Sequence, residues 1–157
     1  MNTLNVLTLG GVDEVGKNLT AYEYKDEILL VDCGSSFPET TMVGVSSIIP
    51  DFTYLRNNKD KIIGIIITHG HEDHIGGLPQ LISEFDLKIY GTRLTLELIK
   101  NKLKDTNTYR NDCLKEYQAG DKFTVGKYFQ IEFIHVTHSI VDSVALAITT
   151  PVGVVMH

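Results

Sequence analysis

Short runs rich in apolar residues recur along the chain, and turn residues separate several of them, as in a protein with many strands. The run at residues 62–68 is nearly continuous and β-branched. It is broken only by Gly64, which predicts a central strand buried on both faces. Lys25 and Asp26 separate two runs and predict a hairpin turn. We expect strands at residues 5–9, 19–24, 27–31, 62–68, 87–90, 123–125, 128–136, 144–149 and 152–156.

Helical patterns occupy the middle of the chain. Residues 94–104 place apolar side chains at helical spacing and lysines towards the end, where cations suit the helix dipole. A second helix is expected at residues 75–84, entered through Gly76 and Gly77, and a short one at residues 52–57. Strands, then helices, then strands again predict a layered α/β sandwich.

The composition is that of a folded globular protein, with 43% apolar and 22% charged residues in a chain of 157. That length corresponds to one domain or to part of one. The net charge of −6 argues against bulk, non-specific binding of nucleic acid, but leaves open a local basic cleft or a basic partner domain.

The cysteines and the N-terminus indicate the compartment. Cys33 and Cys113 are the only cysteines and form no disulfide framework. The first residues lack the charged region and long apolar stretch of a signal peptide, and no apolar run is long enough to span a bilayer. We therefore expect a cytoplasmic protein with no membrane association.

The segment from Thr68 to His74 concentrates the chemistry of the sequence. It holds three histidines and two carboxylates within six residues, at the predicted junction of a buried strand and a helix. Imidazole and carboxylate are ligands that zinc, manganese and iron accept. In an extended turn His69 and His71 point the same way and hold one metal, while Asp73 and His74 hold a second.

Simpler interpretations exist for these side chains. Asp73 would serve as a helix cap, and the histidines would be exposed loop residues. The spacing and position of the whole H-x-H-x-D-H string favour a metal site. The side chain of Glu72 is expected to point away from it.

Candidates outside the string are less specific. His138 follows a predicted strand and is either a third ligand for the first metal or a loop residue, whereas His135 lies within that strand and is expected to be structural. Asp32 also ends a strand, where it would orient a ligand histidine or cap a loop. For Cys33, a buried thiol is a simpler interpretation than a zinc ligand.

A series of short motifs indicates a family. H-x-H-x-D-H after an apolar strand is the signature of the metallo-β-lactamase superfamily, and the whole series resembles the ribonuclease J group of nucleases. The resemblance runs in order over essentially the whole chain. The motifs are LGGVDEVGKN at residues 9–18, VDCG at 31–34, IPD at 49–51, THGHEDHIGGLP at 68–79 and THSI at 137–140.

The resemblance implies a fold and a place in a longer protein. The fold would be the N-terminal half of the αββα sandwich of the metallo-β-lactamases, with residues 1–157 as part of that domain. In the family, a Gly-Asp pair, a later histidine, a β-CASP domain that grips RNA and a C-terminal domain follow the strand that ends here at His157. We therefore expect an inactive fragment with an uncovered apolar face, which leads either to self-association or to disordered edges.

The resemblance also assigns roles to the candidate ligands. His69, His71 and His138 would bind one divalent metal, and Asp73 and His74 the other, with zinc expected and manganese as the alternative. The implied activity is that of a metal-dependent ribonuclease, both endonuclease and 5′-to-3′ exonuclease, in which a hydroxide held between the metals attacks RNA. Asp73 would orient that hydroxide and accept a proton.

Two other functions remain open from the sequence. Other esters, thioesters and lactams are hydrolysed on the same scaffold, although the motifs outside the metal string argue against them. The chain would alternatively be a non-catalytic metal-binding fragment. A reading frame that continues past His157 with a Gly-Asp pair and further histidines would favour the nuclease.

Overall fold

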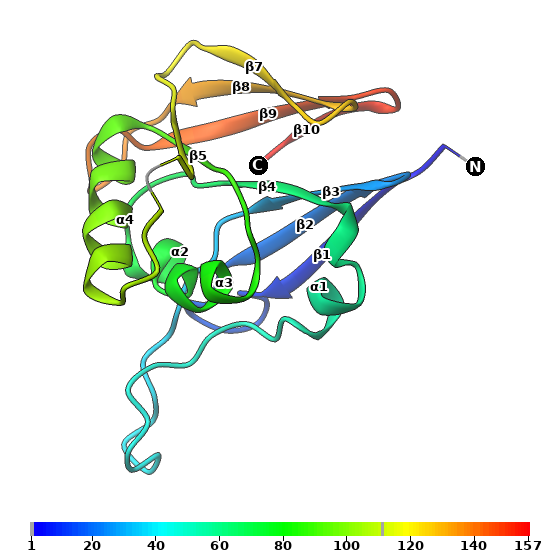
Figure 1. Cartoon of the computed structure of the whole chain (residues 1–157). Coiled ribbons are helices and arrows are strands. Elements are labelled where there is room, and N and C mark those ends of the chain that lie inside the picture. Colours follow the sequence, from blue (N-terminus) through cyan, green and yellow to red (C-terminus); the bar gives the residue numbers. More distant parts are fainter. Residues whose placement is uncertain (1, 111) are drawn as a thin grey trace.

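The computed structural model describes residues 2–110 and 112–157, in which two β-sheets stack and helices cover one outer face (Figure 1). Within these residues the first sheet has six strands in the order β1-β2-β3-β4-β5-β6, and the second has four in the order β10-β9-β8-β7. The predicted α/β sandwich is therefore confirmed. The strands are β1 (Leu4–Gly10), β2 (Leu19–Tyr24), β3 (Glu27–Val31), β4 (Ile62–Ile66), β5 (Ile89–Gly91), β6 (Leu114–Glu116), β7 (Lys122–Val125), β8 (Phe129–His135), β9 (Val144–Thr150) and β10 (Gly153–Met156).

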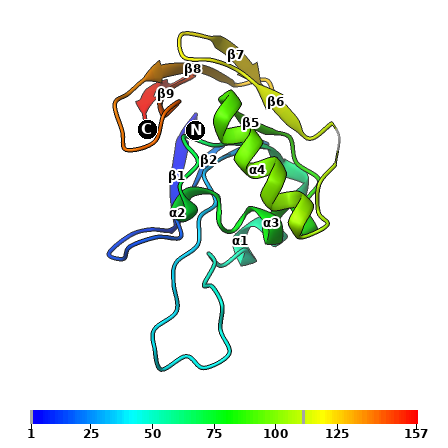
Figure 2. The ribbon, with the colours of Figure 1, turned by 90° about the vertical axis from the view of Figure 1, so that its left-hand side faces the viewer.

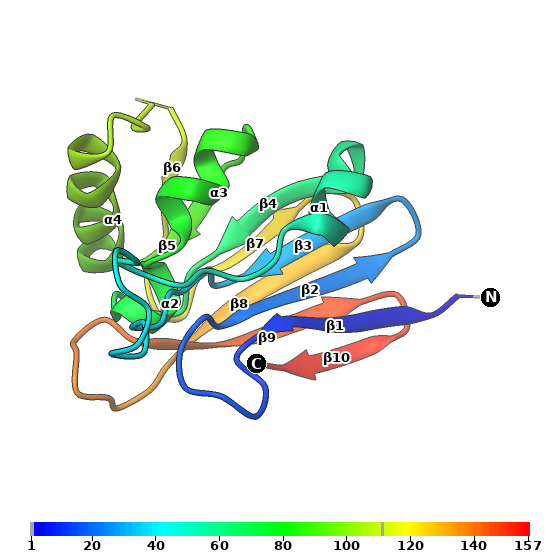
Figure 3. The same cartoon turned by 90° about the horizontal axis from the view of Figure 1, so that it is seen from below.

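Strand directions change within the first sheet. β1, β2 and β3 are antiparallel neighbours, with the predicted hairpin between β2 and β3, whereas β3, β4, β5 and β6 run parallel. β4 lies between β3 and β5, as its continuous apolar run predicted. Parallel neighbours require crossover connections, and the helices lie in these connections (Figure 3).

Two apolar cores lie on opposite faces of the first sheet. Every residue of β3 is buried, because Ile28 and Leu30 face the helices while Leu29 and Val31 face the second sheet. A strand covered on both faces needs apolar side chains at successive positions. This requirement explains the continuous apolar run that follows Glu27 in the hairpin's second strand.

The helices pack against the first sheet. The predicted helix at residues 94–104 is confirmed as the longest of them, and it buries Leu96, Ile99 and Leu103. No helix among residues 2–110 and 112–157 is both long and apolar enough to cross a membrane. The helices are α1 (Thr53–Asn57), α2 (Glu72–Ile75), α3 (Leu78–Glu84) and α4 (Arg93–Asp105), with a 3-10 turn at Lys59–Lys61 (Figure 2).

The helix predicted at residues 75–84 is confirmed as α3 from Leu78 to Glu84, but its predicted start is wrong, because residue 75 ends the separate helix α2. Gly76 and Gly77 separate the two helices, and both lie against the chain that follows β3. A Cβ at Gly76 would clash with Ser35 Oγ, and one at Gly77 would be 2.7 Å from the Gly34 carbonyl oxygen. The close approach of two backbones therefore decides where the helix breaks.

Strand β6 is absent from the predicted elements. It is three residues long and includes Lys115 and Glu116, so it shows no apolar run. It forms because parallel pairing with β5 gives its backbone groups hydrogen-bond partners.

A buried carboxylate joins the two sheets. Glu27 begins β3 and is 5% exposed. Its oxygens accept the backbone N–H of Lys127 at 2.8 and 2.9 Å and that of Tyr128 at 3.2 Å, in the turn between β7 and β8. A buried carboxylate is stable when several donors surround it, and these donors belong to the other sheet.

We expect Glu27→Ala to lower the free energy of unfolding by about 1–3 kcal/mol, since it removes the acceptor of two part-buried backbone N–H groups. Glu27→Gln keeps one acceptor oxygen and should lose less. Urea denaturation followed by circular dichroism gives both values. Glu97→Ala removes a surface ion pair with Lys100 and should cost less than about 0.5 kcal/mol. Equal losses in the two alanine variants would contradict the role of Glu27.

Candidate metal centre

Three histidines of the predicted site gather at the edge of the first sheet where β3 and β4 end. His69 and His71 follow β4, and His138 comes from the loop between β8 and β9. One ring nitrogen of each lies within 4.8 Å of those of the other two, and the ring centroids are 4.7, 4.8 and 4.9 Å apart. Three imidazoles this close form a donor set that a divalent metal such as zinc accepts.

His69 is oriented by a hydrogen bond between its Nδ1 and the Thr68 hydroxyl. The residue is 7% exposed, and its Nδ1 lies 2.9 Å from Oγ1 of Thr68, whose hydroxyl donates to Asp32 at 2.9 Å. Because that hydroxyl gives its proton to Asp32, Nδ1 of His69 is the donor to the hydroxyl oxygen. The lone pair is then on Nε2, which lies 3.1 Å from Nδ1 of His71 and points into the cluster.

Asp32 is the carboxylate behind the cluster. It is 1% exposed, accepts the Thr68 backbone N–H at 2.8 Å, and has its second oxygen 2.7 Å from Nδ1 of His74. Its φ of 59° lies in the left-handed region, which aspartate adopts more readily than most residues. Asp32 therefore orients His74 directly and His69 through Thr68, as predicted for an acidic residue at this strand end.

Asp73 and His74 form a second group beside the first. Oδ2 of Asp73 lies 3.4 Å from Nε2 of His74, and the His69 and His74 rings have centroids 4.0 Å apart. Nδ2 of Asn18 lies 3.3 Å from both of these atoms. Asp73 lies within α2, whose N-cap is His71, and neither α2 nor α3 has a side-chain cap. The capping alternative for Asp73 is therefore wrong.

His69 and His138 of the first group and His74 of the second line a hollow of about 290 Å³ at the edge of the sheet. His157 also reaches it, and Nδ1 of that ring lies 2.8 Å from the Tyr22 hydroxyl. The rest of the lining is Asp32, Thr68, residues 136–137 just after β8 and residues 143–145 at the start of β9.

Burial and neighbouring charges separate the pKa values of the two inner histidines. Burial and the charge of His74 lower the pKa of His69 to about 4, so its ring is neutral at physiological pH, as a metal ligand must be. Burial also opposes the charged form of His74. Its hydrogen bond to Asp32 and the charge of that carboxylate outweigh burial and raise the pKa of His74.

Two other candidates lie away from the cluster. Glu72 turns towards α4 and accepts a hydrogen bond from the Lys102 ammonium at 2.8 Å. The expectation that its side chain points away from the histidine cluster is confirmed. Cys33 is fully buried, and burial together with the Asp32 charge raises the pKa of its thiol. The protonated thiol is thereby favoured, in agreement with the interpretation that Cys33 is a core residue.

Comparison with known proteins gives the family of the chain. Residues 12–146 match the family model described as the metallo-β-lactamase superfamily. The chain belongs to the metallo-β-lactamase superfamily. Solved structures of low sequence identity agree on this fold. The metallo-β-lactamase fold protein YhfI from Bacillus subtilis is 23% identical with a TM-score of 0.69, over 99% of this chain and 62% of that one. A protein of unknown function from Enterococcus faecalis is 18% identical with a TM-score of 0.68, over 98% and 42%.

Curated relatives within the superfamily are named ribonuclease J. The protein from Synechocystis sp. is 49% identical over 98% of this chain and 24% of its own length. That from Thermus thermophilus is 42% identical over 98% and 28%, and ribonuclease J 1 from Streptococcus pyogenes is 40% identical over 97% and 27%. The resemblance predicted from the motifs is confirmed. The chain spans about a quarter of the length of these relatives.

Some residues of this metallo-β-lactamase site carry no clear sequence signal. Asn18 contacts Asp73 and His74, but only the resemblance of residues 9–18 indicated that their loop lies nearby. His157 meets Tyr22 across the two sheets, and no local pattern connects residues so distant in the chain.

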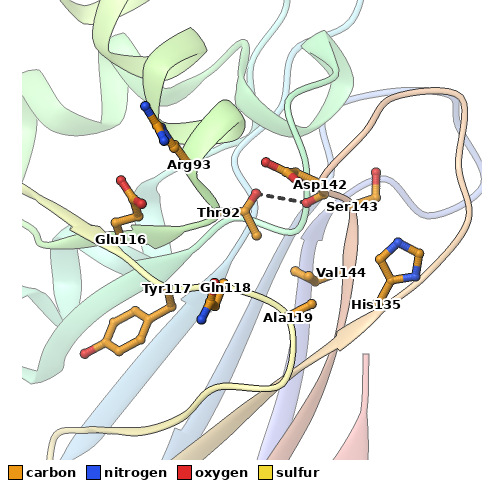
Figure 4. A pocket seen from close by; sticks show the side chains of 10 residues that line it. All are labelled: Thr92, Arg93, Glu116, Tyr117, Gln118, Ala119, His135, Asp142, Ser143 and Val144. Carbon is orange, nitrogen blue, oxygen red and sulfur yellow. Dashed lines mark hydrogen bonds between the residues drawn. The ribbon is translucent and has the colours of Figure 1, made fainter.

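A second hollow of about 290 Å³ lies beside the metal centre, at the N-terminus of α4 (Figure 4). His135 ends β8 with an exposed ring and lines this hollow, outside the three-histidine cluster. Arg93 shares the lining with the carboxylates of Glu116 and Asp142. The mixture of charges indicates no single class of ligand.

We expect Asp32→Asn to lower the pKa of His74 in the metal-free chain, because the charge that outweighs burial is removed and burial remains. Asparagine tolerates the left-handed backbone at this position, so the substitution tests the charge rather than the turn. NMR signals of the imidazole, followed as the pH is varied, give the pKa. Asp26→Asn, at an exposed carboxylate 3.6 Å from the Lys127 ammonium, is the control. A pKa that stays raised in Asp32→Asn would rule out this explanation.

Proposed function

We propose that this chain provides the metal centre of a metal-dependent ribonuclease that hydrolyses RNA phosphodiester bonds. The observation that carries the proposal is the convergence of His69, His71 and His138 within 4.8 Å, in a chain similar to proteins named ribonuclease J. Both internal cleavage and 5′-to-3′ removal of nucleotides belong to the proposal, on the strength of the motif series.

The proposed ligands divide into two sets. His69, His71 and His138 would hold one divalent ion, and Asp73 with His74 would hold a second, with zinc as the first choice and manganese as the alternative. The donor set fits, because Nδ1 of His74 is engaged by Asp32 and its Nε2 faces Asp73 at 3.4 Å. When bound, the ions would supply Lewis-acid activation of water and neutralise charge on the phosphate.

The residues of the chain have separate tasks in this proposal. Asp73 has a side chain that is 42% exposed, so its carboxylate is accessible to orient the attacking water and to accept a proton. Asn18 fixes the direction of that carboxylate through its amide. Asp32 would keep the lone pair of His74 pointing to the site through its bond to Nδ1 of that ring.

The acidic chain is compatible with an RNA substrate in this proposal. Its net charge of −6 disfavours a broad RNA-binding surface, so recognition would depend on the metal centre and on parts of a longer protein. We accordingly propose that the chain alone is inactive. A cytoplasmic location and self-association remain predictions, the latter supported by Val154 and Met156, which are exposed on β10 at the outer edge of the second sheet.

Metal binding is tested directly on the 157-residue chain. We expect native mass spectrometry with added zinc to show one or two bound ions, and His71→Ala to lose at least one, because the substitution removes one of three converging imidazoles. His135→Ala is the matched control, since this histidine is exposed and lies outside the cluster. Equal zinc uptake by the wild type and His71→Ala would refute the ligand assignment.

Activity is tested on the intact gene product that contains this chain. Loaded with zinc or manganese, it should degrade 5′-monophosphorylated RNA, and His71→Ala should reduce degradation to background while His135→Ala retains it. Metal uptake without any cleavage of RNA would keep the metal centre and reject the ribonuclease assignment.

A further inference from the structure

The loop that carries His138 has few bonds of its own. It connects β8 to β9, and His138 is exposed. The Val136 N–H donates to the Ser143 carbonyl at 3.3 Å, and the Ser143 hydroxyl donates to the Ile140 carbonyl at 2.9 Å. An exposed loop samples many conformations unless other elements hold it. The position of the third imidazole therefore depends on contacts from outside the loop.

The first turn of α4 supplies such contacts. Thr92, the N-cap residue of α4, is 3% exposed and donates its hydroxyl to the Asp142 carbonyl at 2.9 Å (Figure 4). The Leu94 backbone N–H donates to Oδ2 of Asp142 at 3.4 Å, where a negative charge also suits the helix dipole. Asp142 has a φ of 64°, in the left-handed region. In this conformation its carbonyl and its carboxylate both face the first turn of α4.

An apolar contact extends this connection to the other two histidines. Gly70 lies between His69 and His71, and a Cβ placed there would be 2.5 Å from Cδ1 of Leu98 and 3.5 Å from Cδ1 of Ile140. Leu98 belongs to α4 and Ile140 to the His138 loop. One helix therefore packs at the point where the two ligand-bearing segments meet.

The sheet ties the far end of the same loop. The Val144 N–H donates to the Thr68 carbonyl at 3.1 Å, directly before His69. Thr68 and Thr92 follow the adjacent parallel strands β4 and β5, whose spacing is set by the sheet at about 4.8 Å. Thr68 and Thr92, which both bond to the His138 loop, are therefore attached to the same edge of the first sheet.

We propose that Thr92 and Asp142 are positioning residues for His138, which hold the third imidazole against His69 and His71 before a metal binds. The inference rests on the proposed metal centre and adds the residues that preset its geometry. Removing a contact that orients a ligand weakens metal binding by about 10- to 100-fold.

Cobalt binding to the 157-residue chain tests this role, because Co²⁺ accepts the same ligands as zinc and its visible absorption reports their geometry. Thr92→Val removes the hydroxyl, and we expect about 10- to 100-fold weaker cobalt binding with an altered absorption spectrum. Thr92→Ser keeps the hydroxyl and should restore both. Thr150→Val is the matched control, since Thr150 is also buried and donates to a turn carbonyl, that of Gly153 at 3.0 Å, at the opposite end of β9.

A second variant keeps the test decisive if Thr92→Val does not fold. Asp142→Gly accommodates the left-handed backbone and removes the carboxylate, at the cost of added backbone freedom, and it should also weaken cobalt binding. Its control is Asn107→Gly, at a φ of 57° after α4. A loss beyond the control in either variant supports the positioning role. Cobalt affinity and spectra that match the wild type in both would overturn it and leave the metal centre standing. No cobalt uptake by the wild type would overturn the metal centre and this inference together.

Discussion

The buried carboxylate of Asp32 binds the parts of the site to one another. It lies just beyond β3 and accepts the backbone N–H and the hydroxyl of Thr68 beyond β4, and its second oxygen meets His74 on α2. A carboxylate that is 1% exposed would be strongly unfavourable without such partners. The partners are therefore not free to move separately, and one charge determines which nitrogen of His69 and of His74 faces the hollow.

The division of the core into two layers allows this edge to carry a site. The faces of β3 and β4 are covered by helices on one side and by the second sheet on the other, so only the strand ends are left for chemistry. Parallel strands end at the same edge, which brings Asp32, Thr68 and Thr92 together. The loop between two strands of the second sheet adds His138 at this edge. Helix α4 contacts both the histidine string and the His138 loop.

Much of the fold follows from local patterns. The strands at residues 19–24 and 27–31 and the helix α4 agree with their predicted positions, because alternation, a turn and helical spacing act over a few residues. The break between α2 and α3 does not follow, since it depends on Ser35 and Gly34 lying against Gly76 and Gly77. Strand β6 likewise depends on its pairing with β5 rather than on its own residues.

The sequence by itself determined the chemistry of the site. His69, His71, Asp73 and His74 lie within six residues of one another, so the sequence alone predicts that they are close in space. The resemblance assigned His138 to the first metal, but local spacing left it open, and only the tertiary structure places it in the cluster. The tertiary structure also decided which histidine Asp32 engages and that Asn18 lies beside Asp73. These pairs are far apart in the chain, and the packing of two sheets and a helix, rather than any local preference, brings them within reach.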